Sequence, residues 1–309
     1  DGLNRVKTIY GSLIIKNNAS LHSLSYLSEL NEIYYDFSIV KGVVIIENNE
    51  ALTSLDGLHN VNHFPADLTI VNNHSLLTIS RLNINSREIL IENNPSLHTI
   101  SDIDFNADNT TVRLFHIKDN INLSSISNII GTVFISGQLI IDNSGLSDLS
   151  GLENIQMGIG GFLINDGMLI KNNNSLVSLN GLHNNLDLLG SVRLENNPLL
   201  SDISVLSEYS SSVLVRIAHC PSMTSLSALN NLTSCSKLEI EGVNGFSNLS
   251  GLENINYMVS FTLLDTNLSD ISQLGLSNQI IDIHIEGNNG ITDLTVFDSI
   301  EIISGAFAS

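Results

Sequence analysis

The sequence predicts a mainly β repeat solenoid, specifically a right-handed parallel β-solenoid of about twelve leucine-rich coils. One observation is a segment with apolar residues at i, i+3 and i+6 that recurs twelve times, from LHSLSYL at 21 to ITDLTVF at 291. A second is the alternating apolar run that precedes each segment and ends in two polar residues, as in LIIKNN at 13–18. A repeat of about 20 to 50 residues is typical of solenoids, in which each coil stacks on the previous one.

The alternating run predicts one strand per coil. Leu13 and Ile15 should face the core while Ile14 and Lys16 face solvent, because side chains alternate along a strand. Strands repeated in the same sense can only form a parallel sheet. The two longest intervals between repeats contain FSIVKG (37–42) and FLINDG (162–167), which predict an additional short strand on a second face.

The two polar residues after each strand predict a corner. The second of the pair is Asn in nine coils, and we expect these side chains to stack as a buried column that bonds backbone groups of its own coil and of the adjacent coil. The first accepts Asn, Asp, Gly and His, which predicts left-handed backbone angles. The predicted structural column contains Asn18, Asn49, Asn73, Asn94, Asn120, Asn143, Asn173, Asn197 and Asn288.

Composition limits the possible partners. The 12 Lys and Arg residues against 32 Asp and Glu residues argue against nucleic acid and anionic membranes, and favour solubility or a cationic partner. There is no run of about 18 uncharged apolar residues, so we expect no membrane insertion within this segment. No linker interrupts residues 1–309, which predicts one continuous domain; its ends lack polar caps, which suggests part of a longer chain. Cys220 and Cys235 are expected to be free thiols.

The repeat as a whole follows the pattern L-x-I-x-N-N-x-x-L-x-[ST]-L-x-G-L-x-N-[ILV]. The clearest matches are VVIIENNEALTSLDGLHNV (43–61), MLIKNNNSLVSLNGLHNN (168–185) and GLENI at 151 and 251. This pattern resembles the receptor L-domain family, a relative of leucine-rich repeats that includes ligand-binding domains of insulin-type and epidermal-growth-factor-type receptors and fungal cell-wall proteins. The resemblance implies an extracellular, cell-surface or wall-associated recognition module.

The open sheet face is the candidate binding surface. One outward column changes from apolar at Ile14, Ile45 and Leu139 to charged at Arg193 and Glu239. A binding face needs an exposed apolar patch with a charged rim, whereas a structural spacer of a wall, coat or surface filament needs only a polar face. We therefore favour recognition or adhesion through a protein or glycan partner, with the spacer as the alternative. The candidate residues are Ile14, Ile45, Leu90, His116 and Leu169, surrounded by Lys16, Glu47, Glu92 and Lys118.

Neighbouring outward charges of opposite sign predict cross-strand ion pairs. The expected pairs are Lys16 with Glu47, Glu92 with Lys118, and Lys171 with Glu195. The acids do not gather into one cluster, so we expect no enzymatic activity and no cofactor.

Metal binding has one weak candidate. Asp102, Asp104 and Asp108 alternate as at the start of a calcium loop, but Ala107 stands where Gly is needed and Arg113 where the bidentate Glu belongs. His59 and His63 have a zinc-like spacing without further ligands. We therefore predict no metal site.

Glycosylation sequons divide between inward and outward positions. If the protein passes through a eukaryotic secretory pathway, we expect a glycoprotein with sugar on the outward set Asn109, Asn122, Asn231 and Asn267. Asn18, Asn73, Asn173 and Asn248 should be closed to a bulky glycan, because their amides are engaged with backbone.

Overall fold

The computed structural model describes residues 3–34, 42–62, 64, 67–105, 110–157, 166–182, 190–276 and 279–303. It is mainly β, with parallel strands in stacked coils, which confirms the predicted parallel β-solenoid. The chain divides into two compact units, Asp1–Gln156 and Met157–Ser309, which we call unit 1 and unit 2. Each unit is described by itself, and the single continuous domain stays a prediction.

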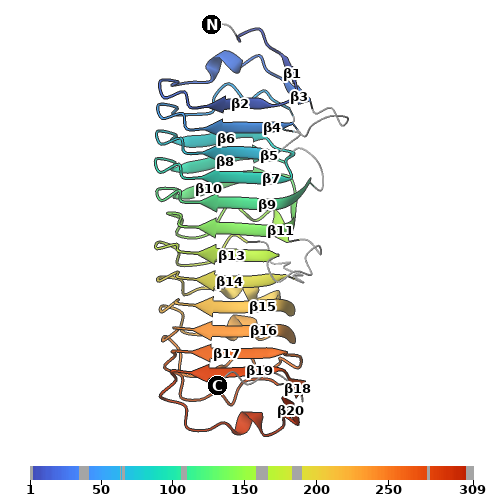
Figure 1. The fold of residues 1–309 in the computed structure, drawn as a ribbon, viewed down its shortest axis with the longest axis vertical. Helices are drawn as coiled ribbons and strands as arrows, with labels where there is room; N and C mark the ends of the chain where they lie inside the picture. Colours follow the sequence, from blue (N-terminus) through green and yellow to red (C-terminus); the bar gives the residue numbers. More distant parts are fainter. Residues whose placement is uncertain are drawn as a thin grey trace. The chain divides into compact units, whose positions relative to one another are not determined.

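Unit 1 has a main parallel sheet of six strands in the order β11-β9-β7-β5-β4-β2 (Figure 1). Each strand comes from one sequence repeat, so neighbouring strands are one coil apart. The strands are β2 (Leu13–Lys16), β4 (Val43–Glu47), β5 (Asp67–Val71), β7 (Glu88–Glu92), β9 (Thr110–Lys118) and β11 (Val133–Asp142).

Unit 1 also contains strands that the repeat pattern did not predict. The segments TISRLN, TISDID and SISNII form the parallel strands β6, β8 and β10, so one strand per coil was wrong here. Their central Ile residues lie opposite one another on neighbouring strands, Ile79 with Ile100 and Ile100 with Ile126, and paired β-branched residues favour extended backbone. These elements are β6 (Thr78–Asn83), β8 (Thr99–Asp104) and β10 (Ser125–Ile130). Unit 1 also contains β1 (Thr8–Tyr10), which pairs with β3 (Glu32–Tyr34), and the 3-10 turn η1 (Ser25–Leu27). Strand β12 (Ile155–Met157) pairs with β11 and ends at the first residue of unit 2.

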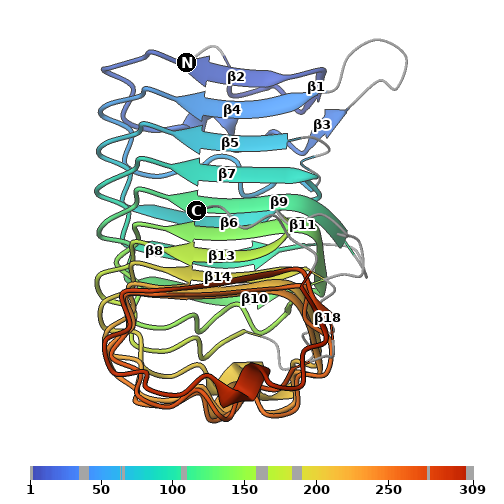
Figure 2. The ribbon, with the colours of Figure 1, turned by 60° about the horizontal axis from the view of Figure 1, so that its bottom comes forward.

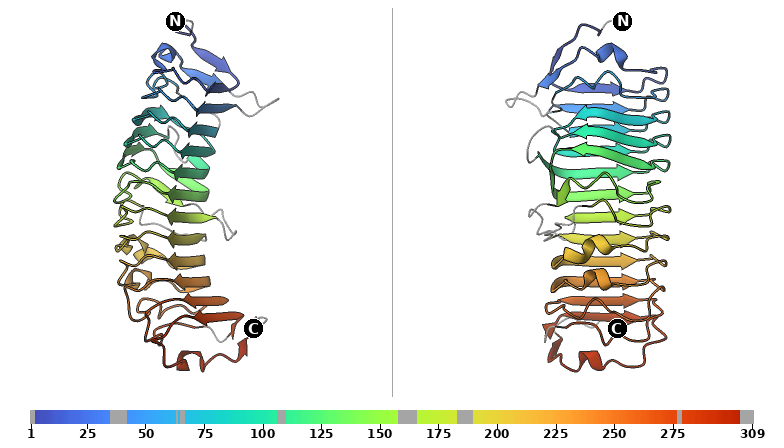
Figure 3. Two further views of the ribbon diagram at one scale, coloured as in Figure 1. Left: turned by 60° about the vertical axis from the view of Figure 1, so that its left-hand side comes forward. Right: turned by 180° about the vertical axis from the view of Figure 1, so that it is seen from behind.

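Unit 2 has its own six parallel strands in the order β19-β17-β16-β15-β14-β13. The strands are β13 (Gly167–Lys171), β14 (Ser191–Glu195), β15 (Ser211–Ala218), β16 (Ser234–Glu241), β17 (Ser260–Leu264) and β19 (Asp282–Glu286). Short 3-10 turns lie across the coil from this sheet (Figures 2 and 3). They are η2 (Ser204–Glu208), η3 (Ser227–Leu229) and η4 (Thr295–Phe297), and β18 (Gln279–Ile280) pairs with β20 (Ile302–Ile303).

The cores are stacked aliphatic columns. Strand β4 alternates as predicted, with Val44 and Ile46 fully buried and Ile45 half-buried on the open face. The residues at i, i+3 and i+6 form the opposite part of the core, as Leu176, Leu179 and Leu182 do in unit 2. Burial in such columns stabilises each coil only when its neighbours are present, because a single coil cannot cover its own apolar side chains.

Left-handed backbone follows every strand of the two main sheets. This confirms the prediction for the first residue of the polar pair, except after β11, where Asn143 was predicted as the second residue. Asn, Asp, His and Gly tolerate that conformation better than other residues. The residues with positive φ are Asn17, Asn48, Asn72, Asn93, Asp119, Asn143, Asn172, Asn196, His219, Gly242, Asp265 and Gly287.

Gly57 explains why the repeat contains L-x-G-L. Its φ is +117°, and a Cβ atom there would collide with the carbonyl of Leu24 in the preceding coil. Glycine therefore permits both the turn and the close stacking of two coils. The predicted second-face strands at 37–41 and 162–165 lie outside the described residues.

Both cysteines are buried free thiols, as predicted. Burial raises the pKa of the Cys220 thiol, and it raises the pKa of Cys235 to about 12. Because the thiolate is the reactive form, we expect neither residue of the native chain to react with a thiol reagent such as DTNB, and both to react after denaturation. Rapid reaction of either thiol in the native chain, followed by absorbance, would contradict this burial.

Candidate binding faces

The inner Asn column is a hydrogen-bonded ladder along the corner that follows the main-sheet strands. In unit 1 the side-chain amide of Asn120 donates to the carbonyl oxygens of Ile91 (2.7 Å) and Lys118 (2.9 Å). Its Oδ1 accepts from the backbone N–H of Asn94 (3.1 Å). The fully buried members are Asn49, Asn73, Asn94 and Asn120 in unit 1 and Asn173 and Asn197 in unit 2, whereas Asn18 is exposed and Asn288 half-buried.

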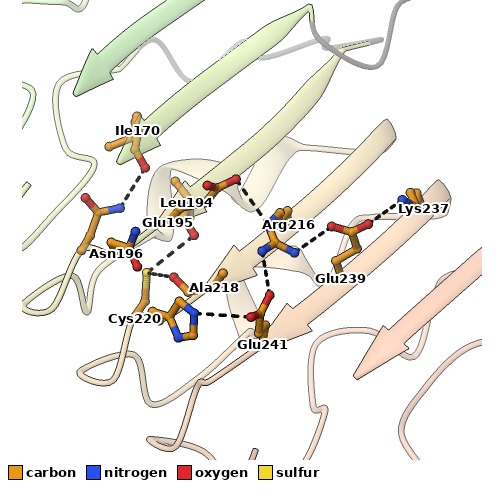
Figure 4. Close-up of polar contacts among 12 residues, drawn as sticks. Ile170, Leu194, Glu195, Asn196, Arg216, Ala218, Cys220, Lys237, Glu239 and Glu241 are labelled. Atoms are coloured by element: carbon orange, nitrogen blue, oxygen red, sulfur yellow. Dashed lines mark hydrogen bonds and ion pairs between the residues drawn. The ribbon is translucent and has the colours of Figure 1, made fainter. Parts of the chain in front are cut away.

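Cys220 replaces Asn in this column of unit 2 and uses the same kind of acceptors. Its Sγ lies 3.7 Å from the carbonyl oxygen of Leu194 in the preceding coil and 3.4 Å from that of Ala218 in its own coil (Figure 4). Each Asn of the ladder accepts from the backbone N–H of the preceding Asn, and the Cys220 sulfur makes the corresponding contact with Asn197 as a weaker acceptor. The ladder is thus structural and positions the ends of the sheet strands.

Asn143 does not lie in the inner column. Its φ is +53° and its amide donates to Asp119 Oδ1 (2.8 Å), which places it in the outer, left-handed position. Ser144 takes the buried inner place. The repeat is one residue shorter between this corner and Leu146, so the count back from Leu146 misplaced the strand residues by one. Ile140 rather than Leu139 therefore aligns with His116 on the open face. Leu139 is fully buried.

The open face of the unit 1 sheet carries an apolar column at the place the sequence predicts. The strand registers align six outward residues, of which Ile14 is 55% exposed and Ile45 and Leu90 are half-buried. The column is Ile14, Ile45, Thr69, Leu90, His116 and Ile140. Leu169, which the sequence also predicted as a residue of the binding face, lies on β13 of unit 2 and aligns with Arg193.

Charged side chains border the apolar column of unit 1. The Lys16 ammonium contacts Glu47 at 2.7 Å, and His116 Nδ1 lies 2.9 Å from Glu92. Glu92 and Lys118 are register partners, but the ammonium of Lys118 contacts Asp119 at 3.7 Å. Glu92 and Lys118 therefore contact other residues in place of each other, and the rim contains charges of both signs.

The open face of unit 2 is charged where that of unit 1 is apolar. Arg216 on β15 contacts Glu195 on β14 (3.3 Å) and both Glu239 (2.9 Å) and Glu241 (2.7 Å) on β16 (Figure 4). Lys237 adds a second cation to Glu239 at 2.6 Å. This network links three adjacent strands through one guanidinium.

The network shifts the ionisation of its members. Partial burial opposes the charged form of Arg216, but hydrogen bonds to Glu241 and Glu239 outweigh it and raise the pKa of Arg216. Burial likewise opposes the carboxylate of Glu239, while hydrogen bonds from Lys237 and Arg216 outweigh it and lower the pKa of Glu239. Both groups are therefore held in their charged forms.

A second asparagine position with a structural role in the repeat was not predicted from the sequence. The Asn of G-L-x-N donates its side-chain amide across to the preceding coil, as Asn60 does to Ser28 (2.7 Å) and Asn254 to Asn230 (2.7 Å). Asn83, Asn154 and Asn231 make the same kind of contact. The sequence signal for this position is the Asn that precedes an apolar residue in both GLHNV and GLENI.

The predicted glycosylation and metal sites lie outside the two candidate binding faces. Asn122, Asn231 and Asn267 are exposed, and Asn109 lies outside the described residues. The amides of Asn122 and Asn231 donate to backbone carbonyls of Pro95 and Ser207. Of the weak calcium candidates, Asp102 accepts a hydrogen bond from Ser101 (3.2 Å), Asp104 ends β8, and Asp108 lies outside the described residues, as does His63.

The stacked parallel strands, leucine columns and asparagine ladder define a leucine-rich parallel β-solenoid. The model of the family described as Receptor L domain matches residues 1–82, which confirms the resemblance to the receptor L-domain family. Receptor L domains are non-enzymatic ligand-binding domains of extracellular receptor ectodomains. Among curated proteins, no match reaches significance. Across the described ranges, no helix has the length and apolar character needed to span a membrane.

Proposed function

We propose that this chain is a non-enzymatic recognition or adhesion module at the cell surface or in the cell wall, and that the open sheet face of unit 1 binds a protein partner. The observation that carries the proposal is the row of aliphatic side chains left accessible on that face, headed by Ile14 at 55% exposure. The family match over residues 1–82 supports ligand binding by the same part of the chain.

The chemistry of the face favours a protein over a glycan. The outward column contains aliphatic, Thr and His side chains and none of the Trp, Tyr or Phe rings that offer a broad face for stacking on a sugar. Accessible aliphatic groups with a rim of charged pairs resemble the centre and edge of a protein interface. Burial of half-exposed Ile and Leu on binding supplies affinity, while Lys16–Glu47 and His116–Glu92 set orientation.

The alternative function is a structural spacer of a wall, coat or filament. A spacer needs no accessible apolar column, and such a column raises the risk of unwanted association. The paired charges around the column are compatible with either function. The apolar column itself is what favours recognition.

The proposal is tested by binding of the chain to a combined protein and glycan array, with the variant Ile45→Asp/Lys118→Glu as comparison. We expect wild type to bind a protein ligand and the variant to lose at least about tenfold in affinity, because a carboxylate replaces an apolar contact and the rim charge is reversed. The matched control, Val177→Asp/Lys7→Glu, likewise replaces an aliphatic residue by Asp and reverses one lysine charge, at exposed sites that do not belong to this column or its rim.

Circular dichroism must show that both variants remain folded. Retained binding by the Ile45→Asp/Lys118→Glu variant would contradict the assigned face. The absence of any ligand for wild type would favour the spacer, and selective glycan binding would contradict the protein partner.

A further inference from the structure

All Lys and Arg side chains of unit 2 lie on one face of one sheet. Residues 157–309 contain only four Lys and Arg residues, and each occupies an outward position on four adjacent strands, β13 to β16. They are Lys171, Arg193, Arg216 and Lys237. Solubility does not require the four cations to lie on one face, because four cations scattered over the surface would keep the protein equally soluble.

This grouping produces a strong local contrast in charge. Residues 157–309 contain 15 acidic residues, which with four basic residues gives a formal charge of −11. The outward face of β13 to β16 carries the four cations and three carboxylates, Glu195, Glu239 and Glu241, a net charge of +1. The face is therefore the most favourable location for an anion on a unit that otherwise repels anions.

Within this face the two arginines differ. Arg216 contacts all three carboxylates, whereas within the described ranges no carboxylate contacts Arg193. The Nε atom of Arg193 is buried and has no hydrogen-bond partner. Arg193 and Arg216 are moreover register partners on neighbouring strands, and like charges placed directly opposite destabilise a sheet.

We propose that the face of β13 to β16 is a second docking surface, that its occupant is an acidic segment of a protein partner, and that a carboxylate of this segment binds the Arg193 guanidinium. A carboxylate there would offset the repulsion between Arg193 and Arg216 and give Arg193 the charge-assisted hydrogen bonds that its neighbour already has. Leu169, the register neighbour of Arg193, supplies adjoining half-buried apolar surface. This inference is independent of the unit 1 face.

The surrounding acidity would make such a surface selective. An acidic partner is repelled by most of unit 2, so other modes of docking are disfavoured. At physiological salt the screening length is about 8 Å, and the local cations therefore dominate over the more distant acids once the partner is close. We expect the interaction to weaken as salt is raised.

The first test measures binding of a labelled peptide of alternating Glu and Ser to the whole chain by fluorescence anisotropy, with alternating Gln and Ser as the neutral probe. The acidic peptide should bind wild type saturably and the neutral peptide should not. Arg193→Gln should weaken the acidic peptide about tenfold, since one charge-assisted pair is lost. The control Arg87→Gln removes the same charge from an exposed arginine of unit 1 and should bind as wild type.

The second readout separates a binding residue from a structural one. Arg193→Gln should leave the melting midpoint unchanged or raise it by about 2 °C, because an unpaired cation is removed beside Arg216. Glu239→Gln should lower it, because Arg216 and Lys237 each lose a partner. The proposal is overturned if the acidic peptide does not bind, if Arg193→Gln binds it as wild type does, or if Arg193→Gln melts as low as Glu239→Gln.

Discussion

Leu179→Asp is expected to lower the free energy of unfolding by about 4 kcal/mol or more. Leu179 is fully buried, and Leu176 and Leu182 of the same coil are buried with it. A carboxylate at this position would lose its hydration without gaining a partner, so the chain must either bury an uncharged acid or open the coil. Because each coil is packed only against its neighbours, the damage should spread to adjacent coils.

The matched control for this variant is Val177→Asp. Val177 is 44% exposed, lies two residues away and faces outward, so its substitution should cost less than about 0.5 kcal/mol. Urea unfolding followed by circular dichroism measures both variants. Equal midpoints for Leu179→Asp and wild type would show that the inside of unit 2 has been assigned incorrectly.

Asn94→Ala is expected to destabilise unit 1 by about 3 kcal/mol. The Oδ1 of Asn94 accepts from the backbone N–H of Asn73 (3.0 Å), and its amide donates to the carbonyl oxygens of Ile70 (3.0 Å) and Glu92 (3.0 Å). These groups are buried or partly buried between coils. Alanine would leave them without partners, and an unsatisfied buried polar group costs more than the hydrogen bond itself contributes.

Asn93→Gly is the control from the neighbouring, outer position. Asn93 is exposed with φ +49°, and glycine adopts this conformation without strain. The substitution removes a side-chain hydrogen bond to Asn72 that solvent can replace. Thermal melting of the two variants should differ by several degrees, and an equal loss of stability would contradict the distinction between inner and outer asparagines.

The repeat period made most of the fold predictable. The positions of Leu176, Leu179 and Leu182 in the core, the alternation along LIIK and the left-handed residue after each strand all follow from local rules of spacing and turn chemistry. These rules act within one coil. Because the same spacing recurs in twelve repeats, each assignment of a residue to the core or to a turn rests on many examples.

The failures occurred where coils differ from one another. A one-residue deletion before Leu146 hid the inner role of Ser144, so Asn143 was assigned to the wrong column and Leu139 to the wrong face. The strands β6, β8 and β10 depend on β-branched residues pairing between neighbouring coils, which no single repeat reveals.

The charged candidates were predicted less well than the apolar ones. Long side chains can choose among several neighbours, as when Glu92 contacts His116 while Lys118 contacts Asp119. The three contacts of Arg216 require the register of three strands together. The register between coils is a tertiary property. The sequence pattern therefore predicted which charged residues face outward, but it did not predict which residues they contact.

The most direct test of the unit 1 binding face is to block the face chemically and to compare binding by the same variant before and after the block. Because Cys220 and Cys235 are buried, Ile45→Cys provides a single reactive thiol on the open face for a bulky maleimide label. We expect the unlabelled variant to bind the protein ligand identified on the array and the labelled variant to lose that binding, while Val177→Cys binds equally before and after labelling. Full binding by completely labelled Ile45→Cys would contradict the assignment of this face.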